Sequence, residues 1–441
     1  MCLTTRQKVQ KLQQALHTKA KESPDFRFYA LYDKLYRPDV LRLAYWTCHQ
    51  NGGAPGVDGQ TFADIEAYGE ERWLGELTEE LRTKAYRPQA VRRVYIPKPD
   101  GKQRPLGIPT IKDRVVQTAA LLVLEPIFEA DLQPEQYAYR PERSALDAVR
   151  HVHRLLNAGH REVVDADLSG YFDTIPHAEL MKSVARRVSD KYVLHLLKMW
   201  LVAPVEERDG QGRTRRTTRN QDEKRGTPQG APISPLLSNL YMRRFILGWK
   251  ALGHARCLRA HIVNYADDFV ICCRGTADEA ATTMREMMQR LKLTVNETKT
   301  HVCRLPTETF DFLGYTFGTC YSRKTGRAQL GTKPSKQKVQ RICAALSAQT
   351  QPKTTWREVG WQVASLNRML NGWANYFSLG FASAAYQAVD RHARHRLRQW
   401  LRRKHKVRGS VEARYPIEYL HERLGLTRLS ARRRSFPRAN V

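Results

Sequence analysis

Two adjacent aspartates stand between two apolar runs in the second half of the chain. The run His261–Asn264 precedes Tyr265, Ala266, Asp267 and Asp268, and the run 269–272 follows them. Apolar runs joined by a short polar link predict a β-hairpin that holds both carboxylates at its tip. Neighbouring carboxylates repel each other, so a cation should compensate them, and hard oxygen ligands favour Mg²⁺. Aspartate pairs are also common in ordinary surface turns.

A third aspartate favours the metal site over the surface turn. Asp167 lies in the short apolar run 162–168, which fits a half-buried strand. Three aspartates from two strand ends form a two-metal site, in which the ions lie about 3.5–4 Å apart. One ion activates an attacking 3′-hydroxyl and the other stabilises the leaving pyrophosphate. We therefore predict that Asp167, Asp267 and Asp268 bind two Mg²⁺ ions, for which Mn²⁺ could substitute, and catalyse nucleotidyl transfer.

The charge of the chain predicts a polyanionic partner. The 441 residues include 74 Lys plus Arg against 44 Asp plus Glu, a formal net charge of +30. A basic excess of this size is typical of nucleic-acid binders. Because phosphate neutralisation releases counterions, we expect affinity for nucleic acid that falls steeply with salt.

Cysteine spacing and hydropathy argue against several other classes. The eight cysteines include no Cys-x-x-Cys pair, so neither a zinc site nor a disulfide framework is expected. The longest uninterrupted apolar stretch, residues 119–124, is far too short to span a bilayer, and the N-terminal residues have no apolar signal-peptide core. We expect a cytoplasmic protein without a membrane partner.

Strands and helices that could position the aspartates alternate without a regular β-α-β period. Residues 91–96 alternate apolar and polar side chains, and a turn at 97–102 precedes a second short run, which predicts a β-hairpin with a basic tip. Residues 113–128 carry apolar side chains at helical spacing, and segment 203–221 is expected to form an exposed hairpin or a mobile loop. From residue 331 the pattern is wholly helical. This mixture predicts an α+β body followed by a helical domain.

Residues 25–330 resemble a reverse transcriptase of the group II intron type, because its sequence blocks occur in the expected order. The blocks are Lys98–Pro109, Tyr139–Pro141 with Ser144, Val164–Asp173, Arg225–Asn239, Tyr265–Asp268, Asn296–Lys299 and Phe312–Tyr315. The segment 331–408 is similar to the thumb, or maturase, domain of these proteins, most clearly over Leu366–Phe377.

The resemblance implies a right-hand polymerase with α+β fingers and palm and an all-helical thumb. The expected domains are an N-terminal helical extension and loop (1–60), fingers and palm (61–330), a thumb or maturase domain (331–408) and a basic tail resembling DNA-binding segments (409–441). The tail has neither the length nor the paired cysteines and histidines of an H-N-H endonuclease. We therefore expect no endonuclease activity, so the protein would depend on DNA strands that are already available at nicks, at forks or as single-stranded DNA.

Several residues in these blocks are candidates for binding a deoxynucleoside triphosphate. Lys98 and Arg104 could clamp the triphosphate, the lysine as a point charge and the arginine through two hydrogen bonds. Gln229 could hydrogen-bond near the sugar, and the missing side chain at Gly230 could let the backbone approach the template or nucleotide. By resemblance, Phe172 places an aromatic ring against the 2′ position, where it would clash with a 2′-hydroxyl.

The resemblance adds two further site residues. Lys299 stands where a general acid could protonate the leaving pyrophosphate. Leu168, which follows Asp167, is expected to contribute to both metal binding and nucleotide binding. As an isolated residue, a lysine would more often be a solvated surface charge.

The helical domain combines cations with aromatic residues. Arg391, Arg394, Arg398, Arg402 and Lys406 recur every three or four residues, so they should line one helix face as a phosphate rail for RNA or an RNA–DNA hybrid. The aromatic residues in this domain are more easily explained as core than as stacking platforms. They are Trp361, Trp373, Tyr376, Phe377 and Trp400.

Family resemblance implies two activities for this chain. The first is RNA-directed DNA synthesis on an RNA template with a DNA primer, which copies intron RNA into target DNA during retrohoming of a mobile element. The second is binding of the group II intron RNA to assist splicing. The implied location is the bacterial cytosol, with nucleoid association when DNA is engaged, and a homodimer is an open option.

Two alternatives remain at this point. A non-catalytic RNA-binding splicing factor would use the polymerase body as a scaffold, but such a protein need not keep Asp167, Asp267 and Asp268. A non-intron reverse transcriptase repurposed for defence or repair would serve a dedicated RNA, and the maturase-like stretch 366–377 disfavours it.

Overall fold

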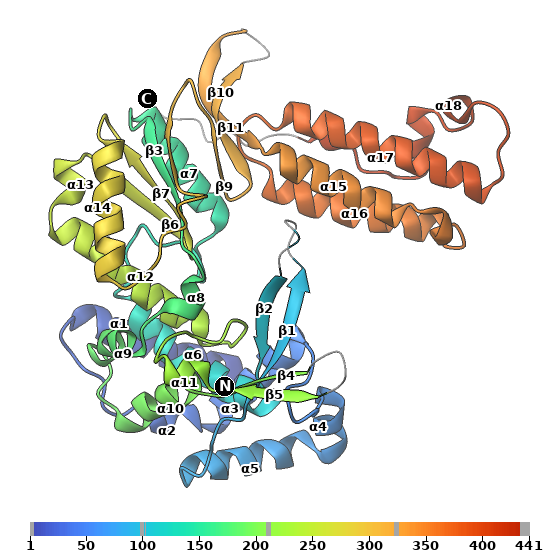
Figure 1. Cartoon of the computed structure of the whole chain (residues 1–441). Coiled ribbons are helices and arrows are strands. Elements are labelled where there is room, and N and C mark those ends of the chain that lie inside the picture. Colours follow the sequence, from blue (N-terminus) through green and yellow to red (C-terminus); the bar gives the residue numbers. More distant parts are fainter. Residues whose placement is uncertain (1–3, 98–100, 102, 209–212, 322–325, 433–441) are drawn as a thin grey trace.

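A computed structural model describes residues 4–97, 101, 103–208, 213–321 and 326–432. Figure 1 shows a body of mixed helices and sheets from which a helical arm projects. The predicted order, an α+β body followed by a helical domain, is confirmed. In the described ranges, no helix is long and apolar enough to cross a membrane.

The central sheet carries the three aspartates. Its strands are β3 (Glu162–Asp167), β6 (His261–Tyr265), β7 (Asp268–Cys273) and β8 (His301–Arg304), in the order β6-β7-β3-β8. All neighbouring pairs are antiparallel. The register places Asp167 of β3 directly opposite Asp268 of β7. The predicted hairpin around residues 265–268 and the predicted strand near 162–168 are both confirmed.

A second sheet projects from the end of the body opposite the central sheet. Its strands are β1 (Val91–Pro97), β2 (Gln103–Ile108), β4 (Val205–Arg208) and β5 (Thr214–Thr217), in the order β2-β1-β4-β5. The antiparallel pair β1–β2 is the hairpin expected from the sequence, and β4–β5 shows that segment 203–221 contains a hairpin. In Figure 1 the β1–β2 hairpin extends from the body on the side where the arm lies.

Helices cover the sheets and supply most of the core. In the body they are α1 (Thr5–Glu22), α2 (Tyr32–Leu35), α3 (Pro38–Asn51), α4 (Phe62–Tyr68), α5 (Glu70–Arg82), α6 (Ile111–Glu129), α7 (Ala145–Asn157), α8 (Tyr171–Thr174), α9 (His177–Ala185), α10 (Lys191–Leu201), α11 (Arg219–Asp222), α12 (Ser234–Ala251), α13 (His254–Cys257) and α14 (Ala277–Arg290). Helix α6 confirms the prediction for 113–128, and its apolar residues Val115, Val116 and Val123 have no exposed area.

The arm is anchored to a third sheet. This sheet contains β9 (Phe310–Phe312), β10 (Tyr315–Tyr321) and β11 (Ala328–Pro334), and the arm contains α15 (Lys336–Gln349), α16 (Val359–Tyr376), α17 (Ser383–Lys404) and α18 (Val411–Arg414). The hydroxyl of Tyr315 donates to the Tyr376 carbonyl at 2.5 Å, and the Tyr376 hydroxyl donates to the Leu313 carbonyl at 2.8 Å. These reciprocal bonds fix the base of the arm against the sheet.

The aromatic residues of the arm only partly follow the core prediction. Trp400 has no exposed area and Phe377 is buried, whereas Trp373 and Tyr376 are half-buried. Trp361 is 48% exposed, so its assignment to the core is wrong. The reason is its position in the first turn of α16, at the end of the arm that points away from the body (Figure 1).

Candidate active site

The three aspartates lie together at one end of the central sheet. Asp167 ends β3, Asp268 begins β7, and Asp267 stands in the turn between β6 and β7. The Cα atoms of directly opposed residues such as Asp167 and Asp268 lie about 4.5–5.5 Å apart. In the turn, Ala266 has a φ of 60°, and the buried Asn264 side chain donates to the Ala266 carbonyl at 2.8 Å. The turn that presents Asp267 is therefore held by a buried hydrogen bond.

Burial and mutual repulsion disfavour the charged forms of these carboxylates. Burial, together with the nearby charge of Asp165, raises the pKa of Asp268 to about 8. Burial and the charge of Asp167 also raise the pKa of Asp267. The same two causes raise the pKa of Asp165 to about 7. Because a divalent cation would remove this penalty, the donor set fits Mg²⁺.

Lys299 and Asn296 already bind one of these carboxylates, the first through its positive charge and the second through a hydrogen bond. The Lys299 ammonium lies 3.1 Å from Oδ2 of Asp167, and Asn296 Nδ2 donates to the same oxygen at 3.0 Å. Asp167, Asp267 and Asp268 share one sheet end, but among the described residues no three His, Cys, Asp or Glu side chains are already arranged closely enough to hold a metal ion. Asn296 belongs to one of the motif blocks, but the sequence did not indicate its role. Its hydrogen bond joins it to Asp167, 129 positions away, and a contact over that separation leaves no local pattern.

Phe172 is brought next to the loop that carries Gln229. It lies in the short helix α8, after Gly170, whose φ is 56°. Its carbonyl accepts a hydrogen bond from the backbone N–H of Thr227 at 2.7 Å. The ring is half-buried and meets Tyr171 edge to face, with 5.8 Å between ring centroids.

Gln229 connects this loop to the β1–β2 hairpin. Its side-chain amide donates to Oδ2 of Asp173 at 3.1 Å, and its carbonyl accepts from the Gly107 N–H at 2.5 Å. At Gly230, φ is 106°, and a Cβ atom would lie 2.4 Å from the Gly107 carbonyl oxygen. The missing side chain at Gly230 thus admits strand β2, and the approach of a template or nucleotide there stays a prediction.

The remaining nucleotide candidates differ in their positions. Arg104 is exposed on β2, and its charge opposes the rise in the pKa of Asp267, which places it within electrostatic reach of the aspartates. The side chain of Leu168 is only 3% exposed, so its backbone alone could contact a ligand. Lys98 lies outside the described residues.

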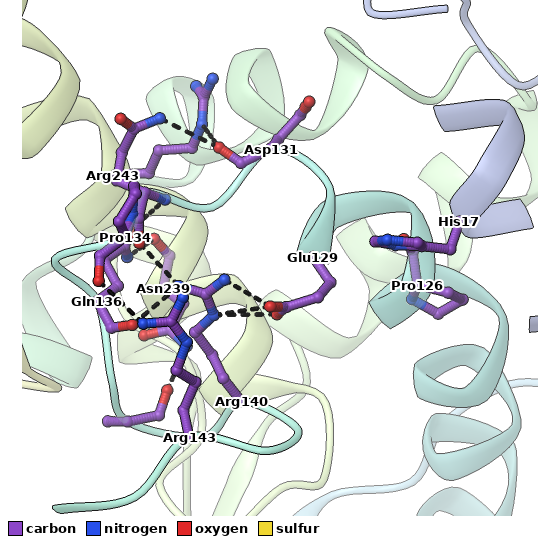
Figure 2. A network of polar contacts seen from close by, with 12 residues as sticks. His17, Pro126, Glu129, Asp131, Pro134, Gln136, Arg140, Arg143, Asn239 and Arg243 are labelled. Carbon is purple, nitrogen blue, oxygen red and sulfur yellow. Dashed lines mark hydrogen bonds and ion pairs between the residues drawn. The ribbon is translucent and has the colours of Figure 1, made fainter. Parts of the chain in front are cut away.

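A polar network braces the loop beside the aspartate turn (Figure 2). Arg140 is almost fully buried and forms an ion pair with Glu129 at 2.5 Å, while its guanidinium also donates to the carbonyls of Gln133 and Gln136. The Gln136 side chain donates to the Asn239 carbonyl at 2.9 Å. These contacts fix loop 131–143 between α6 and α12.

The braced loop is hydrogen-bonded directly to the strand that leads into the aspartate turn. The N–H of Asn264 donates to the Glu135 carbonyl at 2.9 Å, and the N–H of Tyr137 donates to the Asn264 carbonyl at 3.0 Å. Two residues further on, Tyr139 is 52% exposed with a φ of 54°. Partial burial and the charge of Asp267 raise the pKa of the Tyr139 phenol. Tyr139 is thus a neighbour of the site whose role the sequence analysis did not identify.

The predicted row of cations on the last long helix is shorter than expected. Arg391 and Arg402 are exposed and Arg394 is half-buried, but Nε of Arg398 donates to the Tyr415 carbonyl at 2.8 Å and is used internally. Helix α17 ends at Lys404, and Lys406 follows it with a φ of 48°. Placing Lys406 on the helix face is therefore wrong, because the helix has ended before that residue.

Two family models match the chain. The model for reverse transcriptase (RNA-dependent DNA polymerase) matches residues 96–317, which include Asp167, Asp267 and Asp268. The model for the group II intron maturase-specific domain matches residues 339–415, which form the arm. The chain therefore contains a reverse transcriptase domain followed by a helical maturase domain.

Curated relatives agree with the family models. Protein YkfC of Escherichia coli is 34% identical over 377 residues, which cover 77% of this chain and 96% of YkfC. Group II intron-encoded protein LtrA of Lactococcus lactis is 33% identical over 235 residues, 52% of this chain and 37% of LtrA. Nuclear intron maturase 2, mitochondrial, of Arabidopsis thaliana is 38% identical over 94 residues, 21% of this chain and 13% of that protein.

The chain thus spans nearly the whole of YkfC but well under half of the other two relatives. It belongs to the group II intron reverse transcriptase/maturase family.

The raised pKa of Asp268 predicts that Asp268→Asn stabilises the metal-free protein. The folded pKa of about 8 lies above the ordinary aspartate value of 3.8, so ionisation opposes folding as the pH rises from about 4 to 8. The variant should gain about 1–3 kcal/mol of unfolding free energy at pH 8 and almost none at pH 4. Urea unfolding at the two pH values measures this gain.

With Mg²⁺ present, the wild-type protein should be more stable than Asp268→Asn, because Mg²⁺ binds the folded wild-type site and stabilises it by mass action. The control is Asp25→Asn, an exposed aspartate that follows α1, which should change neither the stability nor its Mg²⁺ dependence. Equal Mg²⁺ stabilisation of wild type and Asp268→Asn would contradict a metal site at Asp268.

Proposed function

We propose that this protein is the RNA-directed DNA polymerase of a group II intron, which copies intron RNA into DNA during retrohoming and binds that RNA to assist splicing. The observation that carries the proposal is the convergence of Asp167, Asp267 and Asp268 at one sheet end, within a reverse transcriptase domain that precedes a maturase domain. Its partners would be the intron RNA, an RNA template with a DNA primer, the target DNA and deoxynucleoside triphosphates.

Asp167, Asp267 and Asp268, with the backbone of Leu168, would hold two Mg²⁺ ions. Bound there, the ions would supply charge for the attacking 3′-hydroxyl and the leaving pyrophosphate. The raised pKa values of Asp267 and Asp268 mean that their charged forms are disfavoured without a cation, and bound ions would favour ionisation of both carboxyls. Asp167 would exchange its contact with the Lys299 ammonium for a metal contact. Lys299 would then be free to donate a proton to pyrophosphate.

Phe172, Gln229, Arg104 and Lys98 would select and hold the incoming nucleotide. Phe172 and the Gln229 loop are joined by the hydrogen bond from Thr227 to the Phe172 carbonyl, so both can face one sugar. Arg104 on β2 is exposed and electrostatically coupled to Asp267, as a triphosphate clamp requires. Lys98 would add a point charge.

The body and arm would act as the parts of a right hand. The β1–β2 hairpin and its surroundings would form the fingers, the central sheet the palm, and the arm the thumb, with the boundaries 1–60, 61–330, 331–408 and 409–441 given above. Residue 331 lies inside β11, which ends at Pro334, and α15 begins at Lys336, so the start of the thumb is better placed at residue 335 than at 331. The exposed cations Arg391 and Arg402 and the half-buried Arg394 would contact phosphates, in keeping with the net charge of +30.

Primer extension tests the proposal directly. The wild-type protein should extend a DNA primer on an RNA template with Mg²⁺ and deoxynucleotides, whereas Asp267→Asn/Asp268→Asn should lose several orders of magnitude in rate because metal-ligating charge is removed. Affinity for the RNA should stay nearly unchanged in the double variant, since the basic surface sets it. No extension by either protein, with tight RNA binding by both, would favour a splicing scaffold without polymerase activity.

A second experiment addresses sugar selection. Phe172→Ala should incorporate ribonucleotides more readily, because the ring that would clash with a 2′-hydroxyl is gone. Single-nucleotide extension with matched ribo- and deoxynucleotides measures the ratio of incorporation rates. Phe172→Tyr, which retains a ring, is the control and should keep the preference. Unaltered discrimination in Phe172→Ala would remove Phe172 from the proposed selection step.

A further inference from the structure

The outer end of the arm exposes two tryptophans around one arginine. Trp356 is 78% exposed and Trp361 is 48% exposed. The guanidinium of Arg357 lies 4.5 Å from the ring centroid of Trp361 and 5.5 Å from that of Trp356. Its Nη1 atom is buried and has no hydrogen-bond partner among the residues that the structure describes. We call Trp356, Arg357 and Trp361 the tryptophan platform.

The platform is held rigidly by the last turns of α17. The indole N–H of Trp400, which has no exposed area, donates to Oγ1 of Thr354 at 3.1 Å. The Lys404 ammonium donates to the carbonyl of Thr355, the residue before Trp356, at 3.1 Å. The exposure of the two indoles is therefore a property of an ordered loop. A rigid aromatic surface of this kind loses little conformational entropy when it binds a ligand.

The surroundings of the platform are basic. Segments 352–361 and 401–408, which these bonds bring together, contain seven Lys or Arg and the single acid Glu358. The seven are Lys353, Arg357, Arg402, Arg403, Lys404, Lys406 and Arg408. Exposed aromatic faces among cations match the two groups of a nucleotide, a flat base and a negative phosphate. An acidic or purely apolar protein surface would match only one of these two features.

We propose that the tryptophan platform binds unpaired nucleotides of an RNA, with bases stacked on Trp356 and Trp361 and phosphates held by Arg357 and the neighbouring cations. Bases inside a duplex have both faces covered, so only single-stranded or bulged segments can stack on the indoles. The inference rests on the proposed function in taking RNA as the ligand.

The platform is a site separate from the catalytic carboxylates. Helix α17 has 22 residues and at about 1.5 Å per residue spans about 33 Å, from the base of the arm to its outer end. Figure 1 shows this end pointing away from the body. An RNA held there is a segment other than the template at the primer end, so loss of the platform should leave short-template extension intact.

The test compares the full chain with Trp356→Ala/Trp361→Ala. The dissociation constant for a 12-nucleotide oligo(U) should rise about ten-fold or more, whereas that for a fully paired RNA duplex and the rate of primer extension on a short template should not change. Trp356→Phe/Trp361→Phe, which keeps the aromatic faces, should retain most of the affinity. The matched control is Trp46→Ala, because Trp46 is 42% exposed but donates to Glu70 at 3.2 Å in acidic surroundings.

Four outcomes would overturn the inference. Unchanged oligo(U) affinity in the double alanine variant would show that the indoles do not stack on bases, and an equal loss for duplex would show a non-specific effect. A loss confined to oligo(dT) of the same length would assign the platform to DNA. A changed sedimentation coefficient with unchanged oligo(U) affinity would assign it to a contact between copies of the chain. Failure of primer extension by the wild-type protein, with oligo(U) binding retained, would instead overturn the proposed function.

Discussion

The concentration of negative charge at one end of the central sheet is the constraint on which the rest of the structure depends. Asp167 and Asp268 face each other across β3 and β7, and Asp267 follows in the adjoining turn. Like charges in directly opposed positions destabilise a sheet. The strands tolerate them because their other side chains, such as Val163 and Ile271, are fully buried in the core. The site therefore stores a repulsion that a bound divalent cation would relieve.

Much of the surrounding structure holds this unfavourable arrangement in place. The Arg140–Glu129 network fixes the loop that pairs with Asn264, one strand residue before the aspartate turn. On the other side, the Gly107–Gln229 hydrogen bond joins the β1–β2 hairpin to the loop beside Phe172. A site assembled from segments this far apart in sequence is rigid only if such contacts cross between them. The buried ion pair and the close glycine contact supply this rigidity without touching the reacting atoms.

The local elements could be predicted from the sequence, because their signals are local. The hairpin around Asp267 and Asp268 and the strand that ends at Asp167 follow from apolar alternation and turn residues, and both occur as expected. The order of the motif blocks, and with it the reverse transcriptase and maturase domains, also followed from the sequence, and the family models agree. The assignment of roles to individual side chains remains a proposal.

The positions that the sequence did not predict correctly share a physical cause: the place or role of each depends on which other segments pack against it. Trp361 has the helical spacing of a core residue, yet nothing in its own segment reveals that it lies at the exposed end of the arm. Lys406 continues the cation spacing past the point where α17 ends. Gly230 is required by strand β2, and Asn296 acts through a bond to distant Asp167. Contacts between distant segments determine the place or role of all four residues, and such contacts leave no recognisable pattern in a single sequence.

The most direct test of the central claim is anomalous diffraction from crystals of the protein with Mn²⁺, an RNA template with a DNA primer, and a non-hydrolysable deoxynucleotide. We expect two Mn²⁺ peaks about 3.5–4 Å apart, bound by the carboxylates of Asp167, Asp267 and Asp268. A bound nucleotide with Mn²⁺ peaks that lie away from these three carboxylates would contradict the two-metal assignment.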